Sequence, residues 1–175
     1  MNLEPSNRLS KLHGRVLAQV DQLLELARDE SALALEAPKV SRWNIGQQVE
    51  HLLNADTTIL DRWDLVERGE APSSQGGLRW PGMVCLGLGW IPRGKGKAPE
   101  PTRPVDVSST ELIDGLLSLR RRISQIGRDL AIHETASWRS RHPYFGALSP
   151  AQWLRFMDVH HRHHLAIVRD IRKAS

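Results

Sequence analysis

The sequence is poor in cysteine, in aromatic residues and in long apolar runs, and each shortage excludes a class of protein. A single cysteine, Cys85, means that no disulfide can form within the chain. Aromatic residues make up 5%, and strand-like alternation is rare, which argues against a β-rich fold. The longest apolar run, residues 83–91, is far shorter than the roughly 20 residues of a membrane-spanning helix. We therefore expect an all-α, soluble protein.

The charge is nearly balanced, with 24 Lys and Arg against 20 Asp and Glu, a formal net charge of +4. Residues 120–122 form the only tight basic cluster, whereas a nucleic-acid surface needs a denser stripe interleaved with stacking aromatic residues. Residues 1–15 lack the apolar core of a signal peptide. We expect a cytoplasmic protein with no nucleic-acid partner and no membrane partner.

Apolar residues recur at a spacing of three and four in four segments, which predicts four helices. These segments are residues 7–30, 44–69, 108–133 and 149–173. Asn44, Ser109 and Ser149 are the predicted N-caps, and Gly69 is a predicted C-terminal stop. The pattern predicts one domain over residues 1–175, folded as a four-helix bundle.

Residues 70–107 interrupt this pattern between the second and third helices. They hold six of the ten prolines and seven of the thirteen glycines, so we expect a long irregular insertion with at most a short apolar turn near residues 83–90. The insertion is long enough to act as a lid or to line a pocket, where Trp80 and Trp90 would suit an organic substrate. A packed loop over the end of the bundle fits equally well. Cys85 is expected to be an ordinary buried thiol.

Four of the eight histidines lie between positions 160 and 164 of the last predicted helix. His160 and His164 fall within its apolar stripe and are four residues apart, so both rings point inward from the same face. His161 and His163 flank them and are expected at the edge or exposed. The apolar stripe consists of Trp153, Met157, Ile167, Val168 and Ile171.

Two neighbouring inward imidazoles need polar partners, because protonating both in a low-dielectric interior is costly. A divalent metal would satisfy them, since neutral imidazole is a common ligand and this spacing places two rings within reach of one ion. Two core histidines hydrogen-bonded to polar neighbours are the alternative.

The spacing does not select a third ligand. His13, His51 and His133 each lie on a predicted helix, and His142 lies in a loop whose proline and glycine indicate a structural turn. His51 is off the centre of its helix's apolar stripe and is favoured only slightly. Asp56 is closer to the middle of that stripe, so it is a rival ligand or an acceptor behind a ligand.

Three stretches resemble the DinB/YfiT-like superfamily of bacterial metalloenzymes: WNIGQQVEHLLNA at 43–55, HPYFGALSPAQW at 142–153 and HHRHHL at 160–165. The resemblance covers about residues 40–173, and GWIPRGKGKAPEPTRP at 89–104 is similar to a segment of an uncharacterised branch. It implies a four-helix bundle with a metal, often zinc or nickel, held by three histidines. Carried onto this chain, these are His51, His160 and His164. His161 lies outside the family pattern, and neither it nor His163 is given a role.

Three protein ligands leave an open coordination position, which is typical of catalytic metal sites. The resemblance implies either a hydrolase or a transferase that uses a low-molecular-weight thiol, acting on a small molecule. A non-catalytic metal- or ligand-binding bundle is the alternative, and spare apolar surface would suit a homodimer. Among the carboxylates Glu50, Asp56 and Asp158, Asp56 is the best candidate for a general base, because it shares the inward face.

Overall fold

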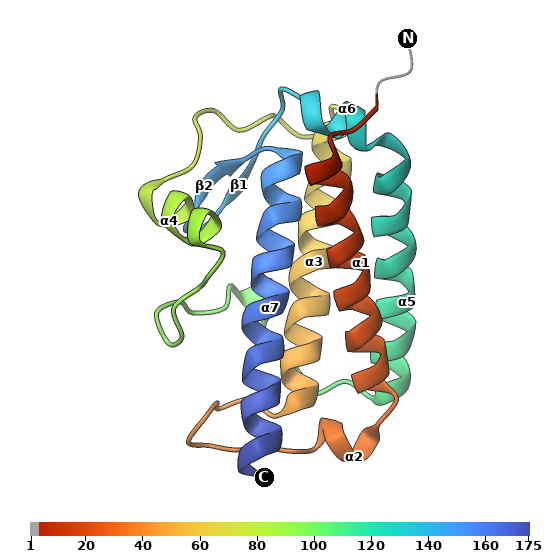
Figure 1. The fold of residues 1–175 in the computed structure, drawn as a ribbon, viewed down its shortest axis with the longest axis vertical. Helices are drawn as coiled ribbons and strands as arrows, with labels where there is room; N and C mark the ends of the chain where they lie inside the picture. Colours follow the sequence, from red (N-terminus) through yellow and green to blue (C-terminus); the bar gives the residue numbers. More distant parts are fainter. Residues whose placement is uncertain (1–3) are drawn as a thin grey trace.

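The computed structural model describes residues 4–175, and four long helices run alongside one another in it (Figure 1). They are α1 (Asn7–Ala27), α3 (Ile45–Glu67), α5 (Ser109–Ile126) and α7 (Pro150–Ala174). Helices α1 and α3 each pack against both α5 and α7. The described chain is mostly helical, which confirms the predicted all-α class.

The packing follows the apolar stripes of the sequence. Val16 and Val20 of α1 and Leu116 and Ile123 of α5 are completely buried, and the two residues of each pair lie four and seven positions apart, respectively. Full burial of such a side chain contributes about 1.5–3 kcal/mol to folding. The core therefore lies along the shared axis of the four helices, and any polar group placed there needs a partner.

The starts of the helices are set by local hydrogen bonds. Asn44 and Ser149 are the N-caps of α3 and α7, as predicted, and each is part of a capping box. Helix α5 starts from Ser108, one residue before the predicted cap, because Ser109 instead donates its hydroxyl to the carbonyl of Ala27 at 2.6 Å. Gly69, with φ of 72°, follows the last turn of α3 and confirms the predicted stop.

Two of the predicted helices are shorter than expected. The first ends at Ala27 and is followed by a separate turn, α2 (Glu30–Leu33), which Asp29 caps. The third ends at Ile126, where the chain passes through η2 (Gly127–Asp129) into α6 (Leu130–Thr135). Helical periodicity does not detect these breaks, because the apolar spacing continues through them.

The segment before α7 forms a hairpin that strand signals did not predict. Strand β1 (Ser140–His142) pairs antiparallel with β2 (Gly146–Leu148). The ring nitrogen Nδ1 of His142 accepts hydrogen bonds from the backbone N–H groups of Tyr144 and Phe145, both at 3.1 Å, and so closes the turn. Strands of three residues are too short to show alternation, which explains the omission.

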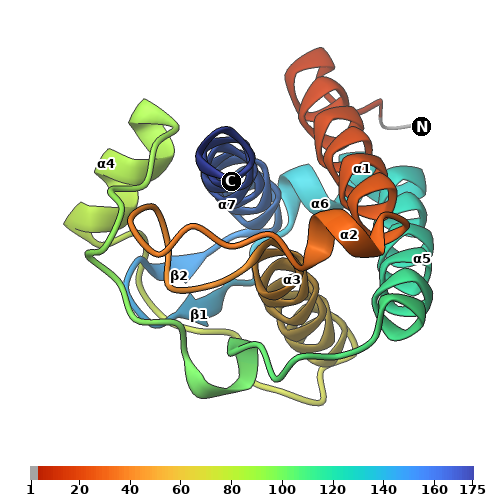
Figure 2. The ribbon, with the colours of Figure 1, turned by 90° about the horizontal axis from the view of Figure 1, so that it is seen from below.

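The insertion is more ordered than expected. It contains a nine-residue helix, α4 (Trp80–Leu88), and a short 3₁₀ turn, η1 (Glu100–Thr102). Helix α4 lies beside α7 on the outside of the four long helices (Figures 1 and 2). Cys85 is buried there, as predicted, and burial raises its pKa. None of the helices in residues 4–175 is long and apolar enough to cross a bilayer.

Candidate metal centre

Three histidines from two helices converge between α3 and α7. The Nε2 atom of His160 lies 3.3 Å from Nε2 of His51 and 3.1 Å from Nε2 of His164. All three side chains are buried, and their ligand atoms lie within 4.8 Å of one another. The structure thus brings together the three histidines that the resemblance selected, and His51 reaches the other two although it is off the centre of its stripe.

Hydrogen bonds on the outer nitrogens fix two of the rings. His51 Nδ1 lies 2.7 Å from the carbonyl oxygen of Thr102, and His164 Nδ1 lies 2.6 Å from Oε1 of Gln48. Both oxygens can only accept, so each Nδ1 carries the hydrogen and each Nε2 keeps a lone pair. Gln48 is itself oriented, because its Nε2 donates to Ser41 Oγ at 2.8 Å.

The inner nitrogens cannot satisfy one another. His51 and His164 both direct a lone pair at Nε2 of His160, which can donate at most one hydrogen. One close nitrogen pair is therefore left without a proton between its atoms. Within the described chain, Nδ1 of His160 has no hydrogen-bond partner either. A cation that accepts all three lone pairs resolves this conflict, so the donor set fits a divalent metal ion.

The electrostatics favour neutral rings. Burial lowers the pKa of His160 and of His164 well below the usual value, and the positive charges of the neighbouring histidines lower both further. Burial also lowers the pKa of His51, against opposing effects of the Thr102 carbonyl and the Asp56 carboxylate. Neutral imidazole is the form that binds metals, so these rings are ready to bind at neutral pH.

The insertion contributes to the site through its backbone. Thr102 in η1 holds His51, and this turn packs along α3. Glu50 holds the chain that follows Thr102. Its carboxylate accepts hydrogen bonds from the N–H groups of Val105 and Asp106 at 2.8 and 3.0 Å. Glu50 is therefore committed to structure, and it is not available as the general base considered from the sequence.

Gln48 and Thr102 were missed in the sequence analysis for different reasons. Gln48 lies three residues before His51 and therefore on the same helix face, so helical spacing could have indicated it. Thr102 acts through its carbonyl group, which carries no side-chain signal. Histidines that bind a metal commonly donate the N–H of their second ring nitrogen to such groups. This hydrogen bond fixes the ring orientation and makes the ligand nitrogen more basic.

The prediction that His161 lies at an edge or in solvent is wrong. Its side chain and that of Asp56 are both 0% exposed, and His161 Nε2 lies 2.6 Å from Asp56 Oδ2. Position 161 is buried because α7 packs against both α1 and α3, so that side chains beside its apolar stripe are covered as well. Asp56 is inward-facing, as expected, but it pairs with His161, and its role as a general base stays a prediction.

The remaining acidic candidate is also engaged. Asp158 is completely buried and bonds to Arg15 at 3.3 Å and to Arg155 at 2.8 Å. Desolvation raises the pKa of this carboxyl, but the hydrogen bonds and charges of the surrounding arginines outweigh it and leave the pKa lowered. Asp158 therefore links α7 to α1 as a carboxylate, away from the three-histidine cluster.

The other helical histidines belong to different parts of the fold. His13 Nε2 bonds to the carbonyl of Ile123 at 2.8 Å, beside the break at Gly127. His133 packs edge-on against Trp63, with ring centroids 4.9 Å apart. The structure brings neither His13 nor His133 to the three-histidine cluster. His142 closes the hairpin turn, which agrees with the structural role expected for that segment.

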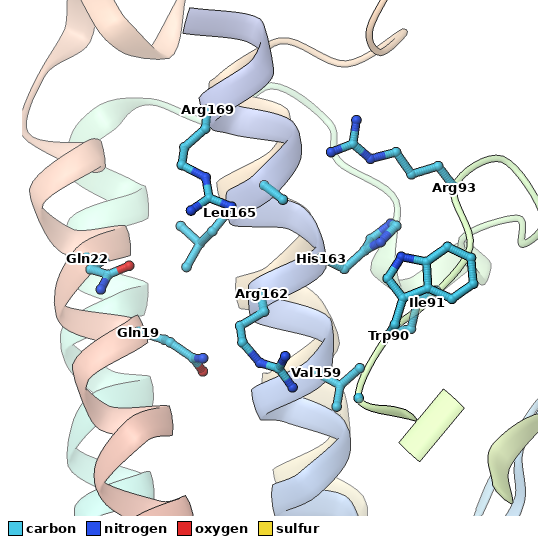
Figure 3. A pocket seen from close by; sticks show the side chains of 12 residues that line it. Gln19, Gln22, Trp90, Ile91, Arg93, Val159, Arg162, His163, Leu165 and Arg169 are labelled. Atoms are coloured by element: carbon cyan, nitrogen blue, oxygen red, sulfur yellow. The ribbon is translucent and has the colours of Figure 1, made fainter. Parts of the chain in front are cut away.

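A cleft of about 410 Å³ lies on another face of α7 (Figure 3). Its lining includes Trp90 and Arg93 of the insertion and His163 of α7, but none of the three clustered histidines. His163 lies between the two sites, since its ring is 4.9 Å from that of His164. The cleft is therefore a neighbouring feature and not the opening of the metal centre.

The arrangement defines a class of protein, a helical bundle with a buried three-histidine cluster suited to a metal ion. Comparison with known families agrees, since the model of the DinB superfamily matches residues 8–168. The chain belongs to the DinB superfamily, whose members bind metals. No curated protein and no solved structure gives a significant match.

Proposed function

We propose that this DinB-like four-helix bundle is a metal-dependent enzyme of the hydrolase or thiol-dependent S-transferase type. His51, His160 and His164 would hold the metal, with zinc or nickel as the best candidates for a site of three imidazoles. The observation that supports this most strongly is the convergence of three Nε2 atoms that cannot all be satisfied by hydrogen bonds to one another.

Three protein ligands leave a coordination position for a small molecule. A metal bound there would supply a Lewis acid that favours the deprotonated form of a bound water or thiol near neutral pH. The chain's own contribution is positional. Gln48 and the Thr102 carbonyl orient the rings of His164 and His51, so that little rearrangement is needed when the metal or the substrate binds.

The insertion gives the site a cover. Thr102 and its neighbours pass over His51, while Trp43 packs on the same ring with centroids 5.0 Å apart. Such contacts keep water away from the His51 ring, as expected for a site that acts on a small organic substrate. These contacts support a role for residues 70–107 in the site.

A non-catalytic metal- or ligand-binding bundle is the second candidate, and one observation favours it. Glu50, Asp56 and Asp158 are all buried and bonded to protein groups. Within residues 4–175, each of these three carboxylates is therefore already engaged, although Oδ1 of Asp56 has no hydrogen-bond partner. If the protein is an enzyme, the proton would pass to Asp56, to the substrate or to solvent.

An activity screen separates the two candidates. The protein, purified without chelator and without a metal-affinity column, is loaded with zinc or nickel and given activated esters, and then electrophiles with and without low-molecular-weight thiols. Turnover that disappears in His164→Ala but persists in His163→Gln supports the enzyme. Stoichiometric metal without any turnover supports the binding protein.

A further inference from the structure

Helix α4 is apolar around its whole circumference. Its sequence, WPGMVCLGL, holds no charged residue. Gly82, Cys85 and Leu86 form the buried face, and a Cβ at Gly82 would come within 2.8 Å of Phe145, so the helix is pressed against the hairpin. A helix that is apolar on all sides is normally buried on all sides. The opposite face of α4 therefore requires an explanation.

That opposite face is open to solvent. Trp80 is 71% exposed, Met83 53% and Leu88 72%, and Trp90, two residues beyond the helix, is 61% exposed. We refer to these four side chains as the α4 outer face. They are half of the eight large hydrophobic residues exposed in residues 4–175. A concentration of this kind on one element marks an interaction surface.

The chain around the α4 outer face carries positive charge only. No acidic residue occurs between Glu70 and Glu100. The same stretch contains Arg79, Arg93, Lys95 and Lys97, of which Arg93 pairs with Asp170 at 2.8 Å. The ion pairs within residues 4–175 include none for the other three cations. The apolar face is therefore bordered by cations that can contact a partner.

The cleft beside α7 extends this positive region. Trp90 belongs both to the α4 outer face and to the cleft wall, and Arg93, Arg162 and Arg169 line the same cleft (Figure 3). Arg162 also bonds to Asp158 at 3.2 Å. None of the described lining residues is acidic. Apolar surface and positive charge thus lie next to each other on this side of the molecule.

We propose that the α4 outer face docks on the surface of a lipid bilayer that contains anionic lipids. Tryptophan favours the boundary between water and hydrocarbon, and leucine and methionine beside it would enter the outermost acyl region. Lysine and arginine are attracted to anionic head groups over about a Debye length. No spanning helix is needed, so the proposal is compatible with the absence of one, although it departs from the sequence-based expectation of no membrane partner.

A second copy of the chain fits the same face less well. A two-fold interface brings the same patch of both subunits together. Arg79, Lys95 and Lys97 of one copy would then face the same residues of the other, and like charges across an interface are repulsive. An anionic lipid surface supplies the opposite charge as well as the apolar phase.

Co-sedimentation of the full chain with vesicles tests the proposal. Vesicles of phosphatidylcholine with phosphatidylglycerol should bind the protein, with a blue shift of its tryptophan emission, whereas phosphatidylcholine alone should bind it far more weakly. Leu88→Glu should weaken binding by roughly tenfold or more. The double variant Lys95→Gln, Lys97→Gln should weaken it by roughly thirtyfold at low salt. Ile132→Glu, an exposed apolar position on α6, is the matched control and should bind as the unaltered chain does.

Several results would overturn the proposal. These are no binding to either vesicle, equal binding to both, or loss of binding in Ile132→Glu to the same extent as in Leu88→Glu. A dimer that Leu88→Glu dissociates, in a protein that ignores vesicles, would assign the face to a second copy. Circular dichroism checks the fold of each variant, and the loop variant Lys95→Gln, Lys97→Gln keeps the test valid if Leu88→Glu fails to fold.

Discussion

Gln48 of α3 holds the ring of His164 on the neighbouring helix α7, because its Oε1 accepts a hydrogen bond from His164 Nδ1 at 2.6 Å. This contact directs Nε2 of His164 toward His160 and His51, so we expect it to matter for metal binding. Gln48→Leu should lower metal affinity by about 10- to 100-fold while leaving the three ligands in place. Competition with a coloured chelator measures the change, and Gln125→Leu, an exposed position on α5, serves as the control. Equal affinity in the two variants would contradict this role.

Glu50 should affect the metal centre at a distance. Its carboxylate holds the backbone at Val105 and Asp106, close to the Thr102 carbonyl that positions His51. Glu50→Ala should destabilise the fold by about 1–3 kcal/mol, because two partly buried N–H groups lose their acceptor. It should also speed release of the metal, measured by stopped-flow transfer to a chelator. Release at an unchanged rate would show that the insertion does not hold His51 in place.

The pair formed by Asp56 and His161 should behave as a structural unit. Asp56→Ala leaves a buried polar partner without its acceptor and should cost about 3–5 kcal/mol in urea unfolding. The double variant Asp56→Leu, His161→Phe should recover part of that loss, because neither polar group then remains buried alone. The double variant should still bind metal. If metal binding is lost in a folded double variant, the pair belongs to the centre itself.

His142 should make the stability of the metal-free protein depend on pH. Burial lowers its pKa from 6.5 to about 4, so the unfolded chain binds a proton more readily than the folded chain does. The contribution of neutral His142 to the free energy of unfolding is therefore complete above pH 6.5, and it is lost as the pH falls from 6.5 to about 4. His142→Asn should flatten this part of the stability curve, measured by chemical denaturation at several pH values. A curve with the same slope as the unaltered chain would contradict the assignment.

The candidate site was partly readable from the sequence. His160 and His164 follow from helical spacing alone, because four residues bring two side chains to one face. His51 needed the family resemblance, since spacing along α3 places it off the apolar stripe. The pairing of His161 with Asp56 joins residues 105 positions apart, and the Thr102 carbonyl has no side-chain signal. Such contacts depend on how the helices and the insertion pack, which local periodicity does not encode.

The fold, like the site, could be predicted from the sequence only where local patterns determine it. The four long helices and the caps Asn44 and Ser149 follow from apolar period and capping chemistry. Helix α4 was expected only as a short apolar turn, because its inner and outer faces are equally apolar and give no helical period. At Gly127, where α5 passes into η2, a Cβ would come within 2.5 Å of the ring of His13. This contact is with another helix, so local periodicity does not show it.

The central claim is that three inward lone pairs form one metal site. Isothermal titration of the metal-free protein with zinc tests it most directly, using single variants His51→Ala, His160→Ala and His164→Ala beside the control His163→Gln. We expect about one site per chain, retained in the control and weakened by orders of magnitude in each of the three. A folded protein that takes up no zinc or nickel, or one whose affinity is unchanged when His160 is removed, would contradict the account.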